Sequence, residues 1–123
     1  MLPAQLFMNQ EKKYAHPLEK DFAEILQREG VTYEYGKLYK VRNGEGIREV
    51  DFVLKKETKT TLSDELLKHL ELKSGGKSAH TKQQQEDLAG AGIHTFIVDR
   101  QKVKFCKKFG FLDRKLVPVP VLV

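Results

Sequence analysis

The chain has 123 residues, of which 32% are charged and 40% are hydrophobic, so its composition is that of one soluble globular domain rather than of a disordered chain. No apolar run approaches the roughly 20 residues that span a bilayer, and the first residues lack the pattern of a signal peptide. A single cysteine, Cys106, excludes an internal disulfide and a cysteine-based zinc site, so we expect a cytoplasmic protein in a reducing compartment.

The charge balance is basic, because 22 lysine and arginine residues outnumber 17 aspartate and glutamate residues and give a formal net charge of +5. With a sequence pI near 9.3, the chain is suited to a polyanionic partner, although many basic domains bind none. Charge alone therefore makes nucleic acid a candidate partner and no more.

Residues 1–16 show no hydrophobic period, and we interpret them as an N-terminal arm before a single domain over residues 17–123. Pro17 is suited to the first turn of a helix, and Gly30 to the position just after one. Glu19 lies in the first turn, where an acid complements the helix dipole or could contribute to a metal site. Apolar residues at helical spacing predict one buried stripe, formed by Leu18, Phe22, Ile25 and Leu26.

Residues 31–41 are rich in valine and tyrosine and predict a strand, and the turn residues 43–46 predict a hairpin to a second strand. Ser63 could cap a helical turn over residues 63–67, so we expect an excursion rather than a tight turn before the third strand. The second strand, residues 48–54, alternates, with Val50, Phe52 and Leu54 on one side and Glu49, Asp51 and Val53 on the other.

The third strand, residues 69–73, alternates in the same way, and a helix over residues 78–91 follows it. If Thr81 and Gln84 form a capping box, this helix begins at Thr81 instead. A buried strand over residues 93–98 then predicts a crossover to a parallel neighbour. Beyond it, Cys106 is expected to be a small buried residue, and prolines restrict residues 117–123 to an edge strand or an extended tail.

The two alternating strands together predict a cluster of charged groups. If they pair with their apolar sides on one core, Asp51, Glu71 and Lys73 emerge together on the opposite face. Two carboxylates and an ammonium group are the set that a divalent-metal phosphodiesterase needs, because Mg²⁺ prefers oxygen ligands and usually takes one or two protein carboxylates. The backbone carbonyl of Leu72 offers a third oxygen, and Lys73, about 7 Å from Glu71 along the strand, is suited to orient water and offset phosphate charge.

An acid on one strand followed by Glu-X-Lys on the next resembles the PD-(D/E)XK nuclease superfamily, which includes type II restriction endonucleases, archaeal Holliday-junction resolvases and VRR-type nucleases. Glu71-Leu72-Lys73 matches the Glu-X-Lys element, Asp51 the isolated acid and Glu19 the glutamate of the first helix. The similarity covers about residues 17–99, and Val50 stands where the family's name has proline. In several branches of the superfamily a glutamine of the site lies on the helix that follows Glu-X-Lys. Here the candidates for that glutamine are Gln83, Gln84 and Gln85, and Gln84 lies on the most suitable face of the helix.

The resemblance implies a restriction-endonuclease-like α/β fold, with a mixed β-sheet flanked by helices in the core order αβββαβ. It also implies a Mg²⁺-dependent endodeoxyribonuclease, in which Mn²⁺ would substitute for Mg²⁺. In that enzyme Asp51, Glu71, Glu19 and the Leu72 carbonyl would bind the metal, while Lys73 and Gln84 would complete the catalytic set.

We expect a structure-selective DNA nuclease of the resolvase-like or repair type, because the chain holds the core and no evident target-recognition domain. A homodimer is expected, since two cuts in a junction take two sites and the apolar tail would gain a partner. Candidate DNA contacts are the residues around the helix start and in the basic stretch 102–108, namely Lys77, Ser78, His80, Lys82, Lys104 and Lys107.

The sequence leaves three alternatives open. The same fold could bind nucleic acid without cutting it, as a module of a larger complex. The acids and the lysine could instead form a solvated sheet face with a cross-strand ion pair. Gly76-Lys77-Ser78 is similar to the end of a nucleotide-binding phosphate loop, but that loop needs a glycine where Glu71 stands.

Overall fold

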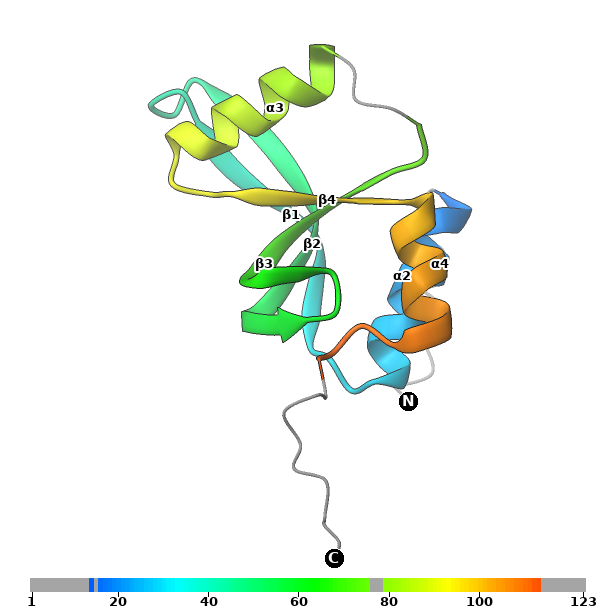
Figure 1. Cartoon of the computed structure of the whole chain (residues 1–123). Coiled ribbons are helices and arrows are strands. Elements are labelled where there is room, and N and C mark those ends of the chain that lie inside the picture. Colours follow the sequence, from blue (N-terminus) through cyan, green and yellow to red (C-terminus); the bar gives the residue numbers. More distant parts are fainter. Residues whose placement is uncertain (1–13, 15, 76–78, 114–123) are drawn as a thin grey trace, which may run out of the picture.

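The computed structural model describes residues 14, 16–75 and 79–113, which form a mixed sheet with helices packed on it (Figure 1). The strand order is β1-β2-β3-β4, with antiparallel pairing of β1 with β2 and of β2 with β3, and parallel pairing of β3 with β4. The predicted α/β class and mixed sheet are confirmed, and a further helix follows the predicted elements. In chain order the elements are α2 (Pro17–Arg28), β1 (Tyr33–Val41), β2 (Gly46–Thr60), β3 (Ser63–Lys73), α3 (Ala79–Gly90), β4 (Thr95–Asp99) and α4 (Arg100–Phe109).

Several predicted features lie outside the described residues. They are most of the N-terminal arm, the candidate DNA contacts Lys77 and Ser78, the phosphate-loop glycine Gly76, and the segment 117–123. Tyr14, near the end of the predicted arm, is described, and it packs against the hydrophobic core. Among the helices of the described ranges, none has both the length and the apolar character needed to cross a membrane.

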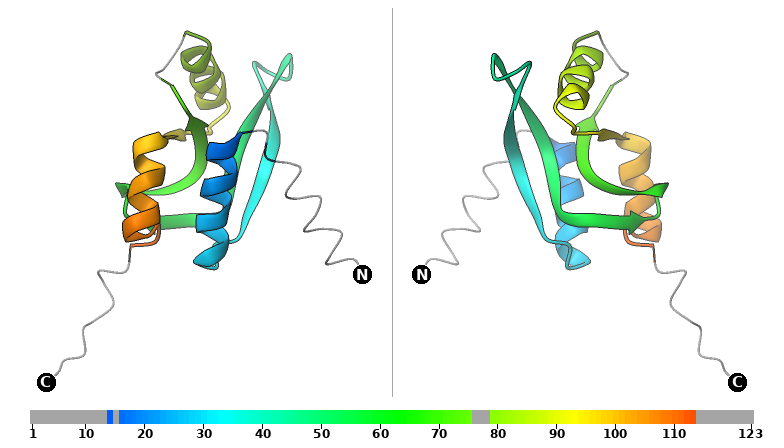
Figure 2. Two further views of the ribbon diagram at one scale, coloured as in Figure 1. Left: turned by 90° about the vertical axis from the view of Figure 1, so that its right-hand side faces the viewer. Right: turned by 90° about the vertical axis from the view of Figure 1, so that its left-hand side faces the viewer.

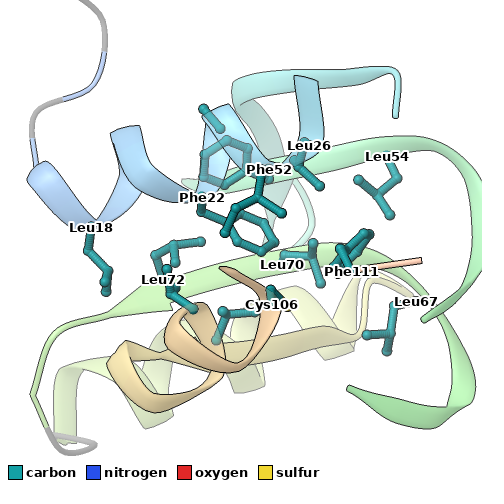
Figure 3. Packing of buried hydrophobic residues seen from close by; sticks show 14 residues of the cluster. Leu18, Phe22, Leu26, Phe52, Leu54, Leu67, Leu70, Leu72, Cys106 and Phe111 are labelled. Carbon is teal, nitrogen blue, oxygen red and sulfur yellow. The ribbon is translucent and has the colours of Figure 1, made fainter. Parts of the chain in front are cut away.

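Helix α2 begins at Pro17 and buries the stripe that the sequence predicts, with Phe22 and Leu26 fully enclosed. It packs on the sheet beside α4, and the two helices run side by side in Figure 2. Between these helices and the sheet lies the main core, where the rings of Phe52 and Phe111 both meet Phe22 edge to face (Figure 3). Burying each such ring contributes about 1.5–3 kcal/mol, so this core fixes α2 firmly against β2.

A bend in the β1–β2 hairpin divides the sheet into two parts. Gly36 adopts a φ of +71°, which side chains other than glycine rarely tolerate, and it lies between the residues that pair with Val50 and Phe52. On one side of the bend Phe52 packs under α2; on the other, Val50 joins a second cluster with Leu88 of α3. The prediction that Val50 and Phe52 share one core was therefore wrong. Val53, predicted to face away from the core, is also buried in the second cluster.

The expected excursion after β2 is absent from the described structure, which was a second error of prediction. Strand β2 continues to Thr60, and β3 begins at Ser63 directly after a two-residue turn, so no helical turn follows Ser63. Tertiary contacts explain the extended conformation. Leu67 is buried in the main core, and the Thr61 N–H donates to the carbonyl of Phe111 at 2.8 Å.

Helix α3 provides the predicted crossover from β3 to the parallel strand β4. Thr81 lies within this helix and is buried, so the alternative start at Thr81 is not observed. Helix α4 was not predicted, because residues 102–105 alternate between basic and apolar residues, which is not the spacing of a helix. Asp99 caps it by accepting the Lys102 N–H at 2.9 Å, and Val103 and Cys106 face the core. The prediction that Cys106 is a buried residue is confirmed.

Candidate functional site

A pocket of about 270 Å³ opens where the first turn of α2 meets β2 and the end of β3. Of the five residues predicted to be catalytic, this pocket brings together four, and the fifth, Gln84, contacts one of the four. Its lining consists of His16, Leu18, Glu19, Asp51, Glu71, Leu72, Lys73 and Ser74. The predicted acids from two strands and one helix therefore share one cavity.

A larger cavity, of about 880 Å³, lies beside the turn between β2 and β3 and the end of α4. Glu29 lines this cavity, and its carboxylate already accepts the N–H groups of Phe111 and Leu112 at 2.7 and 2.9 Å. These bonds give Glu29 a structural role just after the end of α4. We therefore take the smaller pocket as the candidate functional site, because three acids and a lysine line it.

Asp51 lies one residue beyond the last paired position of β2 with β3 on this side of the ladder. The β2–β3 ladder includes the pairs Val53 with His69 and Phe52 with Leu70. One residue further, the Asp51 carboxylate itself accepts the Leu72 N–H at 2.9 Å. The Asp51 carboxylate thus accepts an N–H that a backbone carbonyl would accept in a regular ladder. This hydrogen bond holds the Asp51 side chain at the wall of the pocket.

Glu71 is only 6% exposed, so the alternative of a solvated sheet face does not hold for this carboxylate. The physical reason is that α3 covers this part of the sheet, and Gln84 of α3 donates to Glu71 Oε2 at 3.1 Å. The other carboxylate oxygen, Oε1, is buried and has no hydrogen-bond partner among the described residues. A buried acceptor without a partner is costly, and such groups in native proteins commonly mark sites for an ion or a ligand.

Gln84 is the glutamine that reaches the site. Its Nε2 donates to Glu71 and also to the backbone carbonyl of Glu49 at 3.0 Å, which links α3 to both β2 and β3. Gln83 instead donates to Asp87, and Asp87 binds Arg48 of β2 at 2.8 Å. These contacts fix α3, and with it Gln84, over the pocket.

The electrostatic environment disfavours two ionised acids in the metal-free pocket. Burial, together with the charge of Asp51, raises the pKa of Glu71 to about 8. Burial also raises the pKa of Asp51 to about 6, and the charges of Glu19 and Glu49 add to this effect. The Lys73 ammonium group acts in the opposite direction on both carboxyls, and the Leu72 N–H lowers the pKa of Asp51. A cation in the pocket would relieve this repulsion.

The residues present fit a hard divalent cation. Asp51, Glu71 and Glu19 offer carboxylate oxygens from three elements, and Glu71 Oε1 lacks a partner within the described part of the chain. No group of three or more His, Cys, Asp or Glu side chains is preassembled as a metal cluster in the described residues. Mg²⁺ sites in proteins typically use one or two carboxylates and fill the remaining positions with water and substrate.

The candidate DNA contacts that are described lie away from the pocket lining. His80 and Lys82 are exposed on α3, whereas Lys104 and Lys107 are exposed on α4, at a different side of the sheet (Figure 1). Lys107 forms an ion pair with Asp21 at 3.0 Å, which offsets part of its charge. The structure thus separates these lysines into two groups.

Sequence reasoning missed three residues of the lining and one partner. His16, Leu18 and Ser74 line the pocket, and Tyr35 of β1 donates a hydrogen bond from its hydroxyl to Glu19 Oε1. Alternation in β1 places Tyr35 on the covered side of the strand, but it gives no sign of which carboxylate Tyr35 meets.

No family model, curated protein or solved structure matches this chain. The function is therefore argued from the geometry of the pocket.

Proposed function

We propose that the protein is a Mg²⁺-dependent endodeoxyribonuclease with a restriction-endonuclease-like arrangement of its sheet. One observation carries the proposal: Glu19, Asp51, Glu71 and Lys73 line one pocket, and a buried carboxylate oxygen of Glu71 has no hydrogen-bond partner among the described residues. The order of a helix, three strands, a helix and a strand supports the same reading.

Each residue has a chemical role in this proposal. Asp51 and Glu71 hold the ion, with the Leu72 carbonyl and Glu19 as further oxygen ligands. A divalent cation bound there lowers the pKa of water and offsets the charge of the phosphate. Lys73 orients the attacking water and stabilises the negative charge that grows on the phosphate. Gln84 holds the Glu71 carboxylate in place through its 3.1 Å hydrogen bond.

The proposed substrate is DNA, in keeping with the net charge of +5, and the proposed preference is for branched structures. Mn²⁺ is expected to replace Mg²⁺, because it also accepts oxygen ligands. The proposed active form is a homodimer, since a symmetric pair of sites would allow paired cuts.

The test is a cleavage assay with Mg²⁺ on branched, duplex and single-stranded DNA, using the full chain and two variants. Asp51→Asn removes a ligand charge, and Lys73→Met removes the ammonium group while keeping its aliphatic stem. We expect both to lose at least about 100-fold in rate, and Lys73→Met to retain Mn²⁺ binding measured by calorimetry. The controls are Asp64→Asn and Lys55→Met, which alter exposed residues of β3 and β2.

Normal cleavage by Asp51→Asn would show that the site assignment is wrong. If the wild type binds DNA but neither binds Mn²⁺ nor cuts any substrate, the protein is a non-catalytic nucleic-acid-binding module instead.

A further inference from the structure

A hydrogen bond from a neighbouring strand holds the Glu19 carboxylate in the pocket. Glu19 comes from α2, whereas Asp51 and Glu71 come from β2 and β3, so its position depends on how α2 is tied to the sheet. The Glu19 side chain accepts a hydrogen bond from the hydroxyl of Tyr35 on β1. Tyr35 therefore connects the strand next to β2 with the acid on the helix.

The ring of Tyr35 is itself fixed by packing. It meets the ring of Phe52 edge to face, with centroids 5.3 Å apart, and Phe52 is fully buried. On another side the ring of Tyr14 contacts it edge to face, with centroids 4.6 Å apart. Gly36 follows directly and makes the bend that separates the two clusters. A hydroxyl on a ring held in this way is a rigid donor.

The hydrogen bond from Tyr35 matters because Glu19 lies near another negatively charged group. Glu19 and Asp51 line the same pocket, and their negative charges repel each other when no cation is present. A free Glu19 side chain in the first turn of a helix could rotate away into solvent. A lysine or arginine partner would hold it but would also cancel its charge. A neutral hydroxyl holds the carboxylate and leaves that charge available for a cation.

We propose that Tyr35 is a positioning residue, which holds Glu19 in the pocket so that its carboxylate contributes to cation binding. The inference rests on the proposed metal site. It also explains why a tyrosine, rather than a phenylalanine, lies at this position beside Phe52.

Tyr33 offers a matched comparison two residues away on the same strand. Its ring also packs against Phe52, with centroids 5.4 Å apart. Its hydroxyl bonds Tyr14 at 2.7 Å and accepts from Gln27 at 2.9 Å, and the pocket lining does not include it. Tyr33→Phe and Tyr35→Phe therefore remove the same atom from similar surroundings, and only the second removal touches Glu19.

The experiment measures Mn²⁺ affinity by titration calorimetry for the full-length wild type, Tyr35→Phe, Tyr33→Phe, Glu19→Gln and the double variant Tyr35→Phe/Glu19→Gln. We expect Tyr35→Phe to weaken Mn²⁺ binding about tenfold, the lower end of the effect of losing a residue that orients a ligand. Tyr33→Phe should bind as the wild type does. The double variant should bind as weakly as Glu19→Gln and no more, because both changes act through one carboxylate.

The calorimetry results decide whether Tyr35 positions Glu19. If Tyr35→Phe binds Mn²⁺ as tightly as Tyr33→Phe does, or if the two effects add in the double variant, Tyr35 does not position Glu19, while the proposed metal site stands. If the wild type binds no Mn²⁺, the proposed function and this inference fail together.

Discussion

Replacing Glu71 with glutamine should stabilise the metal-free protein at alkaline pH, even though Glu71 is central to the proposed site. Burial and the charge of Asp51 raise the pKa of this carboxyl from 4.5 to about 8 in the folded protein. Between these two values the folded protein keeps a proton that the unfolded chain has released. Stability therefore falls as pH rises through this window and stays low above it.

The magnitude follows from the pKa. One pKa unit corresponds to about 1.4 kcal/mol, so full ionisation of Glu71 would cost the wild type up to about 5 kcal/mol at pH 9. Glutamine carries no charge at any pH and keeps an oxygen that can accept from Gln84. It still buries a polar amide, so we expect a measured gain of about 1–3 kcal/mol at pH 9. At pH 5, where Glu71 is protonated in the folded protein, the variant should be no more stable than the wild type.

The assay is urea unfolding followed by circular dichroism at pH 5 and pH 9, first with a chelator and then with Mg²⁺. Glu65→Gln is the control, because it makes the same chemical change at an exposed position of β3. Mg²⁺ should stabilise the wild type and the control, since a ligand that binds only the folded state raises its stability, but it should not stabilise Glu71→Gln.

Two results would refute the reasoning. If Glu71→Gln gains no stability on going from pH 5 to pH 9 relative to the wild type, the Glu71 carboxylate is not destabilising in the pocket. If Mg²⁺ stabilises Glu71→Gln as much as the wild type, the ion binds elsewhere.

Mg²⁺ affinity should rise with pH by up to about tenfold per unit for each proton displaced, because the ligands must be deprotonated. With pKa values of about 6 for Asp51 and about 8 for Glu71, the rise should span this interval, and calorimetry at several pH values would detect it; a constant affinity would contradict the assignment. Gly36→Ala should destabilise the fold by about 1–2 kcal/mol, since a side chain at positive φ is strained. Its Cβ would also lie 3.2 Å from Glu49 Oε2, whereas Gly90→Ala, with open space around it, should not destabilise the protein; equal unfolding midpoints for the two variants would contradict the role of the bend.

Local patterns in the sequence were enough to predict most elements. The helical stripe from Leu18 to Leu26 and the alternation around Asp51 and Glu71 are short-range periodicities, and they predicted α2 and the central parts of β2 and β3. They did not predict that β2 continues to Thr60 or that β3 begins at Ser63. The helix between β3 and β4 likewise predicted their parallel pairing. The same patterns singled out the charged residues that now line one pocket.

The errors arose where distant contacts decided the conformation. Ser63 begins a strand because Leu67 joins the main core and Thr61 bonds the chain near Phe111, and neither contact is visible in the local sequence. Helix α4 was missed for a similar reason, since its cap at Asp99 and the burial of Val103 emerge only after β4 has been placed.

The sequence by itself identified the side chains that could form the candidate site. Alternation along a strand is a local property, and it shows which side of each strand Asp51, Glu71 and Lys73 occupy. Only the tertiary structure decided how deeply Glu71 is buried, which glutamine reaches it, and that Tyr35 holds Glu19. Burial and hydrogen-bond partners depend on where α2 and α3 pack, and packing joins residues that are far apart along the chain.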